Sequence, residues 1–130
     1  YEARHDHYRE VWNSWYAKEE NKSYWQKRSR DMARTTQGQY RNGRRSAKVR
    51  KISWSLTFEQ FATLRLGKCV YCDGKLPEAG HGLDRINNLL GYEMGNVLPC
   101  CAECNAHRGA AWTVEETKVA VEAVMKLRAA

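Results

Sequence analysis

The residues of this chain whose types and spacing could do chemistry gather between positions 69 and 109. Two Cys-x-x-Cys pairs stand 28 residues apart, Cys69 with Cys72 and Cys101 with Cys104. Each pair can direct two thiolates at one ion from a tight turn or a helix start, so together they predict a four-sulfur zinc site. Because a site closed by four sulfurs has no open coordination position, we expect this zinc to stabilise the fold and not to catalyse.

Cys100 is the fifth cysteine of the chain. It could replace Cys101 as a ligand only by changing the spacing to Cys-x-x-x-Cys, so we interpret it as a small buried hydrophobic residue. The odd number of cysteines also favours metal binding over a set of disulfides.

Oxygen ligands for a second metal lie between and just beyond the cysteine pairs. Residues 83–86 and 96–98 have the pattern of two short strands joined by a glycine-containing loop, and a helix is expected over residues 101–108. Asp84 would then lie on the first strand and Asn105 on the helix. A carboxylate and a carboxamide can converge on one hard cation, Mg²⁺ or Mn²⁺, and leave other positions for phosphate and water.

Residues 69–109 contain, in chain order, the paired cysteines, Asp-Arg-Ile at 84–86, Gly-Tyr at 91–92, Asn-Val at 96–97 and Cys-Asn at 104–105. This order closely resembles that of the phage-type HNH, or ββα-metal, endonucleases, with a weaker likeness over residues 46–61. The resemblance implies an α+β, zinc-bound ββα-metal module that hydrolyses DNA phosphodiester bonds. It also implies that Asp84 and Asn105 bind the catalytic metal and that Asn96 braces the loop.

The chain departs from this family at the general base, because Arg85 stands where a His ordinarily follows the Asp. A guanidinium stays protonated and cannot take a proton from water, so we expect Arg85 to grip the scissile phosphate. Tyr92 is one alternative base, and it would need a nearby cation. His81 is a second; strand parity places it opposite Asp84 unless Gly82 bends the chain. A metal-bound hydroxide is the third.

Helical periodicity and capping signals predict the remaining elements. Helices are expected over residues 2–20, from a capping box at Ser23 to about residue 35, from Thr57 to about residue 66, and onward from Thr113. Alternating apolar residues predict a short strand over residues 52–56. The last helix should bury a stripe of four residues, Ala120, Val121, Val124 and Leu127. On the helix at 101–108, His107 is turned about 200° from Asn105 and should lie on the surface.

Positive charge is concentrated in the first half of the chain. The 130 residues carry 22 Lys and Arg against 15 Asp and Glu, and residues 22–51 hold eleven basic side chains and one acid, Asp31. Such a field favours a polyanion such as nucleic acid. We therefore expect a basic helical arm over residues 1–51 and a nuclease module over residues 52–130. The expected DNA contacts are Lys27, Arg28, Arg34, Arg41, Arg44, Arg45, Lys48, Arg50, Lys51 and Arg108.

The sequence thus predicts a metal-dependent endonuclease that nicks double-stranded DNA, with no small-molecule cofactor. No run approaches the roughly 18 apolar residues that a membrane span needs, so we expect a cytoplasmic protein of a bacterial host cell, encoded by phage or bacterium. Two alternatives remain. One is a zinc-folded nucleic-acid-binding module that has lost catalysis with the missing His, and the other is a nuclease active only within a larger phage or host assembly.

Overall fold

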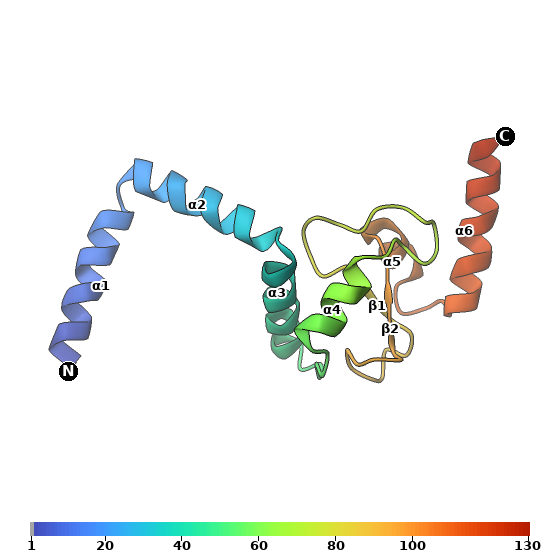
Figure 1. The fold of residues 1–130 in the computed structure, drawn as a ribbon, viewed down its shortest axis with the longest axis horizontal. Helices are drawn as coiled ribbons and strands as arrows, with labels where there is room; N and C mark the ends of the chain where they lie inside the picture. The colour runs from blue at the N-terminus through green and yellow to red at the C-terminus, as the bar shows by residue number, and fades with distance from the viewer. Residues whose placement is uncertain (1) are drawn as a thin grey trace.

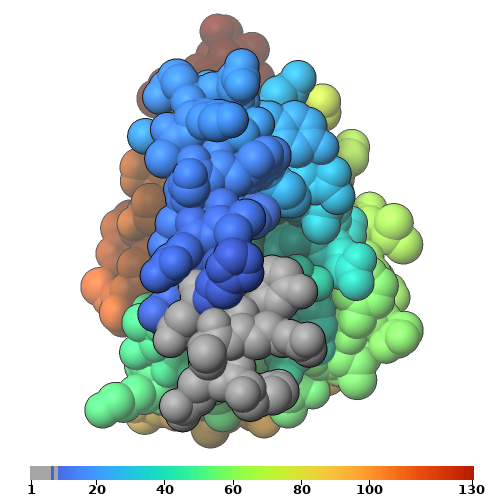
Figure 2. Space-filling model, turned by 90° about the vertical axis from the view of Figure 1, so that its left-hand side faces the viewer, coloured from blue at the N-terminus to red at the C-terminus, as the bar shows by residue number. Residues whose placement is uncertain are grey.

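The computed structural model describes residues 2–130, and within them the side chains of residue 7 and of residues 9–130. Six helices and a two-stranded sheet follow one another along this described chain. Two N-terminal helices extend away from the rest of the molecule (Figure 1), and Figure 2 shows them as a ridge in front of the other elements. The order is α1 (Glu2–Tyr16), α2 (Glu19–Ala33), α3 (Thr36–Val49), α4 (Phe58–Arg65), β1 (Leu83–Arg85), β2 (Val97–Pro99), α5 (Ala102–Arg108) and α6 (Val114–Ala129).

The break between α1 and α2 falls earlier than the sequence predicted. Helix α2 begins at Glu19 after Lys18, so the expected capping box at Ser23 is wrong and Ser23 lies inside the helix. The side chain of Asn21 reaches back to the carbonyl oxygen of Trp15 at 2.8 Å. An aromatic cluster then holds the two helices together, with the Trp12 and Trp25 rings 5.5 Å apart. Tertiary packing here decides the helix start over a local capping signal.

Helix α3 is part of the hydrophobic core, although the sequence placed it in the basic arm. Ala47 is fully buried in the main core cluster. A side chain at Gly43 would place a Cβ 2.8 Å from the Trp54 ring, so glycine allows this close approach. Gly38 also lies within α3, and neither glycine interrupts the helix. The core therefore extends to the amino-terminal side of residue 51.

The segment between α3 and α4 has the predicted alternation but is not a strand of the sheet. Leu56 is buried and Ile52 and Trp54 are half-buried, whereas Ser53 and Ser55 are exposed. Its only ladder-like pairing within residues 2–130 is a parallel bridge between Trp54 and Tyr92. Helix α4 then begins at the predicted capping box, in which Thr57 and Gln60 exchange hydrogen bonds, and buries Phe61 completely.

A ββα unit forms the centre of the fold. Strands β1 and β2 pair antiparallel, with Asp84 opposite Leu98, and α5 follows with Cys101 as its N-cap. The α+β class and the two-strand-plus-helix order predicted from the sequence are confirmed.

Helix α6 begins at the predicted Thr113–Glu116 capping box and packs on α5. Its expected apolar stripe is only partly correct: Val121 packs against the cysteine cluster, but Val124 and Leu127 are 43% and 77% exposed. Among the described residues, none of the helices has the length and apolar character that crossing a membrane requires.

Candidate functional site

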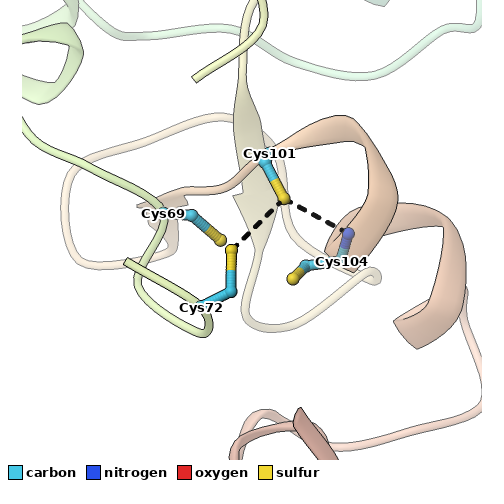
Figure 3. Close-up of side chains that lie close together, drawn as sticks. All are labelled: Cys69, Cys72, Cys101 and Cys104. Atoms are coloured by element: carbon cyan, nitrogen blue, oxygen red, sulfur yellow. Dashed lines mark hydrogen bonds between the residues drawn. The ribbon is translucent and has the colours of Figure 1, made fainter. Parts of the chain in front are cut away.

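The four paired cysteines meet at one point (Figure 3). Cys69 and Cys72 come from the turn after α4, and Cys101 and Cys104 from the start of α5. All four sulfurs lie within 4.8 Å of one another, and the Cys72 and Cys101 sulfurs are 3.7 Å apart. Sulfurs bound tetrahedrally to zinc at 2.3 Å stand about 3.8 Å apart, so the cluster has the dimensions of a four-sulfur zinc site.

The chemistry of the sulfurs also fits zinc, which binds thiolates. Burial raises the pKa of the Cys69 thiol, but backbone N–H groups of Cys101, Cys72 and Tyr71 aimed at the sulfur have the larger combined effect and lower this pKa to about 7. Burial raises the pKa of the Cys72 and Cys104 thiols, so the thiolate form of these two depends on the positive charge of a bound ion. Cys100 is 1% exposed and lies outside the four-sulfur group, with its sulfur donating to the Cys101 carbonyl oxygen at 3.3 Å. Its expected role as a buried hydrophobic residue therefore agrees with the structure.

Asp84 lies buried between the sheet and α5. It is 3% exposed, and its Oδ2 accepts a 2.6 Å hydrogen bond from the Tyr71 hydroxyl. Its Oδ1 pairs with the Arg108 guanidinium. Burial and the neighbouring Asp84 carboxylate raise the pKa of Tyr71, so this hydroxyl stays a hydrogen-bond donor. Tyr71 was not among the predicted site residues, because a tyrosine inside a Cys-x-x-Cys turn has no periodic signal in the sequence.

The prediction that Arg108 contacts DNA is wrong. It is 3% exposed, and besides Asp84 it donates to the carbonyl oxygens of Arg85, Ile86 and Trp112 at 2.5, 2.8 and 3.0 Å. The side chain thus ties the end of β1 to α5 and to the chain that follows. Four of the five guanidinium N–H groups therefore have partners inside the protein, and this buried side chain is not available to a DNA backbone.

Asn105 lies on the side of α5 that Asp84 faces. Arg108, which reaches Asp84, follows Asn105 by three residues, and on a helix this separates the two side chains by about 60°. Asn105 is exposed and, with His81 and Asn42, lines a hollow of about 390 Å³. We call this the His81–Asn105 hollow. Tyr71 and Arg108 each occupy one lone pair of the Asp84 carboxylate, and each oxygen keeps a second. Asp84 itself is not among the residues that line this hollow, so the structure does not bring its carboxylate into the hollow with Asn105. A carboxylate and a carboxamide are nevertheless the kinds of oxygen donor that a hard divalent cation prefers.

The predicted base candidates lie together on the opposite face of β1. Leu83 and Arg85 alternate with Asp84 along the strand; Leu83 packs in the core with Tyr92, and the Arg85 guanidinium lies 5.3 Å from the centre of the Tyr92 ring. The Tyr92 hydroxyl is 3.4 Å from Nε2 of His81. His81 lies before β1, and Gly82 between them has a φ of 65°, so the chain bends there and strand parity does not decide the direction of the His81 side chain.

His81 has no lone pair left to act as a base in this arrangement. Its Nδ1 accepts a 3.0 Å hydrogen bond from the Leu83 N–H, which leaves the proton of the neutral ring on Nε2, facing Tyr92. Burial lowers the pKa of His81 to about 4, and the charges of Arg50, Arg65 and Arg85 lower it in the same direction. The ring is therefore neutral at pH 7 and donates to the phenol oxygen.

Acidification from pH 6.5 to pH 4 is expected to lower the free energy of unfolding through His81. The folded pKa of about 4 lies below the unfolded value of about 6.5, so the unfolded chain binds the proton first. The stabilisation is complete above the unfolded pKa and is lost as pH falls through the folded pKa; about 1.4 kcal/mol per unit gives about 3 kcal/mol in all. Urea unfolding of the wild type and His81→Asn between pH 7 and about pH 5.5, in the range where the cysteine cluster still holds zinc, measures the first part of this loss.

Acid also protonates the cysteine cluster, but it does so in both proteins, and the difference between their stabilities isolates the histidine. This difference should change with pH over the stated range. Parallel stability curves for the two proteins would contradict the assignment.

Two further predicted residues fix the loop between the strands. Asn96 is 5% exposed; its side chain accepts from the Asn87 N–H at 2.9 Å and donates to the carbonyl oxygens of Asn87 and Gly91 at 3.1 and 2.8 Å. Arg85 donates from Nη1 to the carbonyl oxygens of Asn88 and Leu90, both at 2.9 Å. These bonds hold the Arg85 guanidinium beside Tyr92.

The other predicted DNA contacts lie on the surface of α2 and α3, between these two helices, and just beyond α3. Arg50 also donates to the Tyr92 hydroxyl at 2.9 Å, so it links the end of α3 to the base candidates. His107 is exposed on α5, 3.8 Å from Glu103, as expected for a surface residue. The exposed basic residues of the predicted set are Lys27, Arg28, Arg34, Arg41, Arg44, Arg45, Lys48, Arg50 and Lys51.

Comparison with known proteins supports the fold. No protein-family model matches the chain. Over 54 residues, 42% of this chain, the sequence is 39% identical to the uncharacterized protein R423 of Acanthamoeba polyphaga mimivirus, and the match spans 10% of that protein's length. The structure is similar to that of the rare-cutting HNH restriction endonuclease PacI, with a TM-score of 0.61 and 20% identity, over 72% of this chain and 78% of that one.

The fold is therefore similar to that of an HNH endonuclease, and the four-cysteine cluster has the dimensions of a zinc site. At 20% identity the likeness to PacI concerns the fold alone.

Proposed function

We propose that the protein is a metal-dependent endonuclease that hydrolyses phosphodiester bonds of DNA. The observation that carries this proposal is a ββα unit fastened by four cysteines, in which Asp84 of β1 pairs with Arg108 of α5, the helix that also carries Asn105. The likeness of the fold to a DNA-cutting HNH enzyme supports it. The exposed cations of α2 and α3 provide the charge that attracts a polyanion.

Asp84 and Asn105 would hold one Mg²⁺ or Mn²⁺. When bound, such an ion supplies positive charge that stabilises the leaving oxygen of the phosphodiester. Tyr71 orients the Asp84 carboxylate through its hydrogen bond, and Arg108 fixes the same carboxylate from α5. Arg85, held beside Tyr92 by the loop carbonyls, would meet the negative charge of the phosphate.

We assign the acceptance of the water proton to the phenolate of Tyr92, which forms when the Tyr92 hydroxyl first gives up its own proton to solvent. We do not assign this role to His81, because its Nδ1 accepts from the Leu83 N–H and its Nε2 faces the Tyr92 hydroxyl. The Tyr92 oxygen receives hydrogen bonds from Arg50 and from His81, and donors of this kind stabilise the negative oxygen through which a phenol acts as a base.

Tyr92→Phe is expected to lower the rate of DNA nicking by roughly 100-fold or more, the usual contribution of a general base. His81→Gln, which removes only a donor to the same oxygen, should lower the rate by about tenfold. Single-turnover nicking at saturating DNA measures both rates. Unchanged DNA affinity in Tyr92→Phe would show that binding is intact, and an unchanged rate would exclude Tyr92 as the base.

Supercoiled plasmid incubated with the purified protein tests the proposed function directly. Cleavage is expected with Mg²⁺ or Mn²⁺ and not with EDTA, and nicked circles should precede linear DNA because the chain has one candidate centre. DNA binding without cleavage under all these conditions would overturn the proposal in favour of a binding module. Cleavage only after a partner protein is added would identify a nuclease that works within an assembly.

A further inference from the structure

A second hollow lies between α2 and α3, next to the His81–Asn105 hollow. Asn42 of α3 lines both hollows, so the two share a wall. The second hollow measures about 340 Å³ and is walled by Trp25 and Arg28 of α2 and by Arg41 and Arg45 of α3. We call it the α2–α3 groove. The α2–α3 groove is thus adjacent, through Asn42, to the hollow that the candidate metal ligand Asn105 lines.

The charge of the groove has one sign. Three guanidiniums line it, and among the residues that the structure describes no Asp or Glu does. Arg41 and Arg45 are one helical turn apart and therefore lie on one face of α3. The Arg28 guanidinium lies 5.5 Å from the centre of the Trp25 ring, which fixes it at the opposite wall. Guanidiniums arranged in this way suit phosphate groups, which they can bind with two hydrogen bonds each.

Other cations of the arm point elsewhere. Arg44 lies over the Tyr40 ring at 5.5 Å and lines neither hollow, although it is exposed on the same helix as Arg41 and Arg45. Lys48 is also exposed on α3 and lines neither hollow. The groove is therefore lined by only some of the basic residues of the arm, and other residues of equal charge lie outside it.

We propose that the α2–α3 groove binds the sugar–phosphate backbone of one DNA strand as this strand leaves the His81–Asn105 hollow. Arg28, Arg41 and Arg45 would contact its phosphates. This inference rests on the proposed function, because it assumes that the DNA strand is cut beside Asn105 and extends from there into the groove. It adds that these three arginines, and not the positive charge of the arm as a whole, set the affinity for the strand beside the cleavage site.

The test compares two double variants that each remove two positive charges from α3. Arg41→Ala with Arg45→Ala alters the groove, and Arg44→Ala with Lys48→Ala is the matched control. DNA binding is measured by fluorescence anisotropy in EDTA over a series of salt concentrations, with circular dichroism to confirm equal helix content. The groove variant should lose about two units from the slope of log K against log salt, and the control clearly less.

Separate arms with a single-stranded and a duplex oligonucleotide show which form the groove holds. A loss of slope on single strands alone means that the strand is unpaired there, and a loss on both means that the groove follows a duplex backbone. Equal slopes for the two double variants on both oligonucleotides would overturn the proposal.

Failure of the groove and failure of the proposed function are distinguishable, because binding is measured without metal. Plasmid nicking by the wild type with equal slopes would reject the groove alone. Loss of slope without any nicking would reject the catalytic assignment and keep the groove as a nucleic-acid site.

Discussion

Replacing Cys104 with Ser is expected to remove zinc from the protein and to abolish its cooperative unfolding transition. Zinc bound by four thiolates contributes on the order of 10 kcal/mol of apparent folding free energy, which exceeds the stability of most small domains. The cluster joins the turn after α4 to the start of α5, and Val121 of α6 packs against it. Without the ion, these three segments lose the group that holds them together. Elemental analysis and thermal unfolding measure the two effects.

Cys100→Ser is the matched control, because it exchanges the same atoms at a buried cysteine outside the four-sulfur cluster. It should keep one zinc per chain and lower the free energy of unfolding by about 1 to 3 kcal/mol, the cost of burying a hydroxyl. Zinc content that stays at one per chain in Cys104→Ser, or that is lost in Cys100→Ser, would show that the ligands are assigned wrongly.

Asn105→Ala is expected to lower metal-dependent nicking by at least about 100-fold without changing the stability of the fold. Asn105 is exposed, so removing its side chain leaves no cavity, whereas loss of a metal ligand removes several kcal/mol of transition-state stabilisation. Asp84→Asn should lower nicking at least as much. It should also lower the free energy of unfolding by about 3 to 5 kcal/mol, because Arg108 stays buried without its counter-charge.

Single-turnover nicking over a range of Mn²⁺ concentrations, together with urea unfolding, separates the two variants. His107→Ala is the control: it is exposed on α5 two residues from Asn105 and should keep the wild-type rate. A wild-type nicking rate in Asn105→Ala would remove Asn105 from the metal site. Wild-type stability in Asp84→Asn would show that the ion pair with Arg108 contributes nothing to the fold.

The local signals in the sequence predicted local structure well where no tertiary contact competed with them. Thr57 and Thr113 each cap the helix that follows, because a capping box involves only residues three apart. Ser23 has the same signal but lies inside α2, since aromatic packing between α1 and α2 moves the helix start to Glu19. Val124 and Leu127 have helical apolar spacing, and yet they are exposed because no element of the described chain covers that part of α6.

The positions of the four zinc ligands and the order of the ββα unit could be predicted from the sequence alone. Ligand type, spacing and strand parity depend only on residues that are close together in the chain. Only the tertiary structure decided which charged groups are paired and which are open. Arg108 has the appearance of one more surface cation in the sequence, but it is buried against Asp84, and Tyr71 joins it there. The same structure brings His81 and Tyr92 together, with the Tyr92 hydroxyl 3.4 Å from Nε2 of His81. Pairing depends on the distance between side chains that are far apart in the chain, and spacing in the sequence does not encode that distance.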